Sequence, residues 1–96
     1  MINETLLAAA QYMDEHGKAL GTNVDGEGRV CMMGAIEAVG EDRVQVIGAA
    51  RRVRDYARAQ GLSTTEVTFI SDFLLGEKAE TVKFMMEAAE WEPSND

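Results

Sequence analysis

The chain has 96 residues, 46% of them hydrophobic and 27% charged, and its formal net charge at pH 7 is −8. This length suits a single hydrophobic core and excludes a two-domain organisation. The acidic balance argues against direct binding to nucleic-acid backbones, which require a basic surface. One cysteine cannot form an internal disulfide. The sequence lacks a signal segment and an apolar run of the roughly 20 residues that cross a bilayer, so we expect a cytoplasmic protein that does not enter a membrane.

The hydrophobic spacing predicts an all-α domain of about four helices over residues 1–91, followed by a polar C-terminal tail at 92–96. Asn3 has a side chain suited to capping a first helix, which is expected to run to about His16. Gly17 would end this helix. The glycine-containing stretch that follows is predicted to be a loop.

The second predicted helix, at about 30–39, is apolar almost all round, which is typical of a buried helix. We expect it to be the centre of the bundle. One of its sides carries small residues and a thiol that would let a neighbouring backbone approach closely. These expected structural core residues are Cys31, Gly34, Ala35 and Ala38. Gly40 suits the left-handed position just beyond the end of this helix.

A third helix is predicted to begin after Asp42, which can cap it, and to end before Gly61. A row of cations follows one side of this helix at spacings of three and four residues, with Ile47 in the same row. The cations are Arg43, Arg51, Arg54 and Arg58. Two interpretations stay open: a solvated face whose arginines pair with acidic segments of the same chain, or an interface for a partner.

The stretch 62–76 is ambiguous. Ser63 and Glu66 have the spacing of a capping box, which favours a short helix, whereas many neighbouring residues are β-branched or aromatic, which favours an extended connection. Both conformations stay open for this stretch.

A last helix is predicted from about Glu77 to about Trp91, and it has two apolar faces where a small bundle usually buries one. The second of these faces comprises Phe84, Ala88 and Trp91. It is either covered inside the domain or exposed as a contact for a protein partner or a second copy.

Catalytic and metal chemistry have little support in the sequence. Zinc normally takes several Cys or His ligands, and the chain has one of each, so we predict no metal and no cofactor. Cys31 lies at the start of its predicted helix, where the thiol pKa can fall. A cysteine-dependent enzyme that uses Cys31 with His16 is therefore one alternative, and a buried structural cysteine is the other.

The run Glu15-His16-Gly17, a loop, and then Asp25-Gly26 through Cys31 to Ile36 resembles a small helical domain of unknown function found in actinobacteria and their phages. The shared layout is H-G-x, a loop, and D-G-x-x-x-x-C-x-x-G-A-[LI]. The resemblance implies a helical fold and an actinobacterial or phage host, and it transfers no catalytic residues.

These observations lead us to expect a non-enzymatic protein-interaction module, an accessory protein that binds a protein partner or forms a homodimer. Its candidate contacts are the Phe84, Ala88 and Trp91 face and the arginine row. Besides the cysteine enzyme, a further alternative is an acidic protein that imitates nucleic acid and blocks a basic site.

Overall fold

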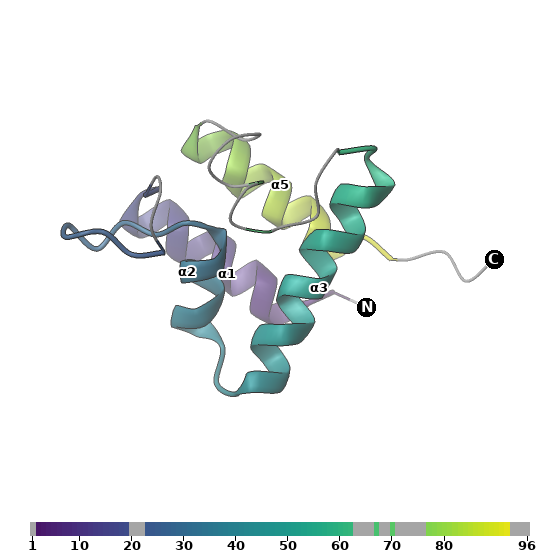
Figure 1. Cartoon of the computed structure of the whole chain (residues 1–96), viewed down its shortest axis with the longest axis horizontal. Coiled ribbons are helices and arrows are strands. Elements are labelled where there is room, and N and C mark those ends of the chain that lie inside the picture. The colour runs from purple at the N-terminus through teal and green to yellow at the C-terminus, as the bar shows by residue number, and fades with distance from the viewer. Residues whose placement is uncertain (1, 20–22, 63–66, 68–69, 71–76, 93–96) are drawn as a thin grey trace.

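The computed structural model describes residues 2–19, 23–62, 67, 70 and 77–92. Helices account for most of this part of the chain (Figure 1). They are α1 (Glu4–His16), α2 (Met32–Val39), α3 (Arg43–Ala59) and α5 (Lys78–Glu90). The described residues form no strand, only isolated bridges from Val30 to Lys18 and Val24. The predicted all-α class is therefore confirmed, while most of the ambiguous stretch 62–76 and residues 93–96 of the predicted tail lie outside the described residues.

The helix ends follow from local sequence. Asn3 Oδ1 accepts a hydrogen bond of 2.9 Å from the Leu6 amide, and Asp42 Oδ1 accepts one of 2.9 Å from the Gln45 amide. Each oxygen satisfies an amide that the first turn of a helix leaves without a partner. At the end of α1, Gly17 has a positive φ of 94°, which glycine adopts readily. The predicted caps of the first and third helices are thus confirmed.

Helices α1 and α5 run antiparallel and are tied together at both ends. The Asn3 amide donates a hydrogen bond of 2.8 Å to the Ala89 carbonyl oxygen. At the other end, Lys78 Nζ donates one of 3.0 Å to the Asp14 carbonyl oxygen. Helices α1 and α3 each contact all three of the other helices, whereas α2 packs mainly on α1 and α3. This differs from the predicted central position of the 30–39 helix.

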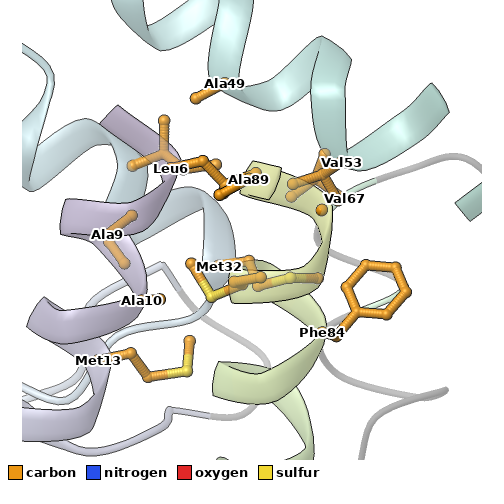
Figure 2. Packing of buried hydrophobic residues seen from close by; sticks show 14 of the residues in the cluster. Leu6, Ala9, Ala10, Met13, Met32, Ala49, Val53, Val67, Phe84 and Ala89 are labelled. Carbon is orange, nitrogen blue, oxygen red and sulfur yellow. The ribbon is translucent and has the colours of Figure 1, made fainter. Parts of the chain in front are cut away.

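Apolar side chains from all four helices form the core (Figure 2). The residues of α1 that face it are Leu6, Ala9, Ala10 and Met13. Ala89 of α5, Val53 of α3 and Met32 of α2 are buried in the same cluster. The alanines of α1 and α5 allow these two helices to pack closely, as the dense interior of a protein requires.

The α2 helix corrects two expectations. Its buried side carries Met32, Ala35 and Ile36, whereas Ala38 is exposed, so Ala38 is not a core residue. Gly40 has φ −70°, an extended conformation and not the predicted left-handed one. A Cβ atom at Gly40 would lie 2.5 Å from Cγ2 of Val46, so glycine here lets α3 approach the end of α2.

Candidate functional site

Cys31 acts as the N-cap of α2. Its side chain is 1% exposed, and Sγ accepts a hydrogen bond of 3.4 Å from the Gly34 amide while donating one of 3.4 Å to Asn23 Oδ1. The Cys31 amide also donates to the Asn23 carbonyl oxygen at 3.1 Å. The thiol therefore joins the start of α2 to the preceding loop, a structural use of the cysteine.

His16 lies at the exposed end of α1. Its ring stacks on Tyr12 with centroids 3.9 Å apart, and Nδ1 is 2.9 Å from the Tyr12 carbonyl oxygen, to which the Nδ1–H tautomer donates. Within the described residues no hydrogen bond joins His16 to Cys31. The hydrogen bonds described for these two candidate catalytic side chains therefore go to different partners, those of His16 to Tyr12 and those of Cys31 to Gly34 and Asn23.

The loop before α2 is organised by Asp25. Its Oδ1 accepts hydrogen bonds of 2.9 Å from the amides of Glu27 and Arg29, and its Oδ2 accepts one of 2.6 Å from Arg29 Nε. Desolvation raises the pKa of the Asp25 carboxyl, but the hydrogen bonds from Arg29 and the Glu27 amide together lower it more, so this pKa lies below its usual range. Gly28 takes a positive φ of 81° and completes the turn.

Asp25→Asn is expected to lower the stability of the fold at neutral pH, because the amide cannot form the ion pair with Arg29. Since the pKa of Asp25 is lowered by folding, its carboxylate stabilises the folded state fully above about pH 4, the usual pKa of an unfolded aspartate. This contribution is lost as the pH falls through the lower pKa of the folded state. Thermal unfolding of wild type and variant over a pH series measures the difference.

Glu15→Gln is the control for this prediction, because it removes an exposed carboxylate outside the loop. We expect it to leave the unfolding temperature nearly unchanged at neutral pH. An Asp25→Asn protein that matches wild type at neutral pH, or that is still less stable than wild type at a pH low enough to protonate Asp25, would contradict the assigned role of this carboxylate.

The second apolar face of α5 is covered by α3. Phe84 is 8% exposed and Ala88 is fully buried. The Tyr56 ring of α3 packs edge to face on Phe84, with centroids 5.0 Å apart, and on Trp91, with centroids 5.9 Å apart. Of the two alternatives for this face, Phe84 and Ala88 take the covered one, while Trp91 is partly buried, so Phe84, Ala88 and Trp91 do not form the exposed interface that was the other alternative.

The arginine row is on the surface of α3. Its cations Arg43, Arg51, Arg54 and Arg58 are all exposed. Among the described residues, none of these four side chains forms an ion pair or a hydrogen bond, whereas Arg29 and Lys78 do pair with carboxylates. Within the described part of the fold, no carboxylate therefore lies within ion-pairing distance of these four arginines. We call the surface made by these arginines and Ile47 the basic face of α3.

An open groove of about 470 Å³ lies between α2 and α3 and adjoins the basic face. Its lining residues are Met33, Glu37, Arg43, Val46 and Ile47. Ile47 is 46% exposed, and nearby Val44 is 78% exposed. Glu37 is held at the rim, where its Oε1 accepts a hydrogen bond of 3.2 Å from Asn23 Nδ2. Apolar and basic groups therefore meet on one accessible surface.

A family comparison covers nearly the whole chain. Residues 2–90 match the model of a family described as "Family of unknown function (DUF6197)". The chain belongs to this family. The match includes every helix of the DUF6197 protein described above, up to the last residue of α5. Comparisons with curated proteins and with solved structures find no significant match.

The described residues of this DUF6197 protein add two negative findings. They contain no group of three or more His, Cys, Asp or Glu side chains placed to hold a metal ion. None of their helices combines the length and the apolar character that spanning a bilayer demands.

The sequence analysis did not identify two residues of the candidate surface, Val44 and Met33. Val44 lies about 100° around α3 from Arg43, on the side of the helix away from the buried Val53, and is therefore exposed. The helical period alone predicts this exposure. Met33 lines the groove because α2 turns this side toward α3 and solvent. No local pattern indicates that contact, which depends on how the two helices pack.

Proposed function

We propose that this DUF6197 protein is a non-enzymatic interaction module that acts by binding another protein or a second copy of itself. The contact surface is the basic face of α3 together with the α2–α3 groove. The observation that carries the proposal is the exposure of Ile47 and Val44 beside four arginines that have no partner among the described residues. On the basis of the sequence resemblance, we further propose an accessory protein of actinobacteria or their phages, working in the host cytoplasm.

The composition of this surface supports binding to a protein. Arginine is enriched at protein interfaces because its apolar stem packs while its guanidinium donates several hydrogen bonds. An exposed Ile47 at the mouth of a groove supplies an apolar anchor of the kind that dominates binding energy. Water solvates the exposed arginines but not Ile47, so the exposure of this isoleucine adds nothing to the stability of the fold.

The two other functions considered from the sequence receive less support. Cys31 caps a helix from a buried position and His16 hydrogen bonds within its own helix, so neither group is arranged for nucleophilic catalysis. An imitation of nucleic acid needs a continuous acidic surface, and the basic face of α3 interrupts it.

Site-specific photo-crosslinking tests the proposal. A benzophenone amino acid that replaces Ile47 is expected to crosslink to a protein in the cells that normally contain this chain, or to a second copy. Met86 is the matched control position, because it is an apolar residue of α5 with 43% exposure, close to the 46% of Ile47. We expect the same crosslinker at Met86 to give no product of that mass.

Light scattering over a concentration series separates the two forms of the proposal. A mass of two chains that Ile47→Asp reduces to one chain indicates self-association through this face. A single-chain mass combined with a crosslink from position 47 indicates a different protein. Equal crosslinking from positions 47 and 86, or none from either, would overturn the proposed function.

A further inference from the structure

We infer that the occupant of this surface is an acidic amphipathic helix of another protein, lying along α3 with one apolar side chain in the α2–α3 groove. This inference rests on the proposed function and goes further, because it assigns the partner's chemistry and secondary structure. It is argued from the charge of α3, the spacing of the row and the position of the groove.

The charge of α3 opposes that of the rest of the chain. Five arginines and one aspartate lie between Arg43 and Ala59, whereas the whole chain carries −8. The four exposed arginines of the basic face have no carboxylate partner among the described residues, although the chain is rich in carboxylates. A partner that supplies carboxylates is complementary to this face and is repelled elsewhere, so charge directs it to α3.

The spacing of the row defines the partner's pattern. Ile47 lies one helical turn from Arg43 and one turn from Arg51, and it lines the groove. A partner helix with an apolar side chain against Ile47 therefore places carboxylates one turn before and one turn after it near these two arginines. The row from Arg43 to Arg58 extends about 22 Å at 1.5 Å per residue, so a partner helix of about 15 residues covers it.

The groove orients this helix. Met33 and Val46 offer apolar surface for the anchor, while Glu37 forms part of the α2 side of the groove. The hydrogen bond from Asn23 Nδ2 holds the Glu37 carboxylate there. Carboxylates of the partner are therefore repelled from the α2 side and attracted to the α3 side, which fixes the rotation of the partner helix about its own axis.

A second copy of this chain is a poor occupant. Two-fold pairing of α3 with itself, centred near Arg51, places Arg43 of each copy opposite Arg58 of the other. Like charges facing one another in this way oppose association. An acidic helix of a different protein satisfies the same arginines and the same apolar anchor without that repulsion.

Selection from a displayed library of random peptides of about 15 residues tests the inference directly. Wild-type protein is the bait, and peptides that also bind Ile47→Asp are removed. We expect the retained sequences to share an apolar residue flanked by Asp or Glu at spacings of three or four. A representative synthetic peptide is expected to bind Arg51→Glu/Arg54→Glu at least about tenfold more weakly than wild type.

The matched control is Lys78→Glu/Lys83→Glu, which makes the same change of net charge on exposed positions of α5 and also removes the hydrogen bond from Lys78 to the Asp14 carbonyl oxygen, far from the basic face of α3. It is expected to bind the peptide within about twofold of wild type, because the basic face of α3 is unchanged and exposed charges on α5 are screened from it. Circular dichroism of both double variants verifies that they retain the helical fold.

The outcomes separate the inference from the proposed function. Retained peptides that lack acidic residues, or that bind Arg51→Glu/Arg54→Glu as well as wild type, overturn the acidic helix while the interaction surface stands. A library that yields no peptide sensitive to Ile47→Asp contradicts both.

Binding of a fluorescent DNA or RNA strand at physiological salt that depends on Arg51 and Arg54 would assign the face to nucleic acid instead. A dimer that dissociates in Arg51→Glu/Arg54→Glu would assign it to a second copy.

Discussion

Gly34→Ala is expected to lower the free energy of unfolding by about 3 kcal/mol or to prevent folding. A Cβ atom at Gly34 would lie 2.0 Å from the Asn23 carbonyl oxygen and 2.8 Å from its carbonyl carbon. Both atoms belong to the backbone, so no side-chain rotation relieves the clash. The loop must move, and its hydrogen bonds to the Cys31 amide and thiol are then weakened. Urea unfolding monitored by far-UV circular dichroism measures the loss.

Gly48→Ala is the matched control for this substitution. Gly48 lies inside α3 and is exposed, and a Cβ atom built on it meets no atom within 4 Å apart from the neighbouring residues and backbone of its own helix. Alanine has a higher helix propensity than glycine, so this variant is expected to gain about 0.5–1 kcal/mol. The same gain at Gly34 would show that the Asn23 backbone does not lie against α2 as described.

The helix boundaries could be predicted from the sequence because their causes are local. Asn3 and Asp42 lie at the starts of their helices and accept hydrogen bonds from amides three residues ahead. This spacing of three residues between the capping side chain and the amide can be recognised in the sequence itself. Gly17 ends α1 in the same local manner, with a positive φ that favours glycine.

The faces of α2 could not be assigned in this way. Periodicity separates Ala38 from Ile36, but both sides of the helix are apolar, and the pattern does not indicate which side meets α1. Gly34 is buried for a different reason, since the Asn23 backbone from the preceding loop covers it. That contact depends on the turn organised by Asp25, which no helical pattern describes.

The candidate surface was predicted only in part. Four arginines on one side of a helix follow from spacing alone, and their exposure agrees with it. The groove depends on how α2 packs beside α3, so the sequence did not indicate it. For the same reason the sequence left the environment of Phe84 open, because the ring that covers it, Tyr56, comes from a helix distant in the chain.

Arg52 is the residue of α3 that sequence reasoning overlooked, since it interrupts the spacing of the basic face. Its Nη1 donates hydrogen bonds to three carbonyl oxygens at the end of α5, at 3.3 Å to Ala88, 3.0 Å to Ala89 and 2.6 Å to Trp91. Carbonyls in the last turn of a helix have no partner within that helix and carry its negative dipole end. The partly buried guanidinium of Arg52 therefore caps the C-terminal end of α5 and joins it to α3.

Arg52→Ala is expected to lower the free energy of unfolding by about 2–3 kcal/mol, the usual range for hydrogen bonds to a charged group together with a helix-end charge. We expect the end of α5 to unfold before the rest of the domain does. Trp91 is the only tryptophan, so its fluorescence reports the end of α5, and we expect its emission to shift to the red at urea concentrations that leave the far-UV signal unchanged.

Arg54→Ala removes the same charge two positions further along α3, from an exposed side chain with no hydrogen bond among the described residues. Its stability is expected to stay within about 0.5 kcal/mol of wild type. If both variants lost stability equally, the net charge of α3 would be responsible and not the carbonyls of α5. A loss confined to Arg52→Ala separates the arginine that builds the fold from those on the basic face, which remain available for a partner.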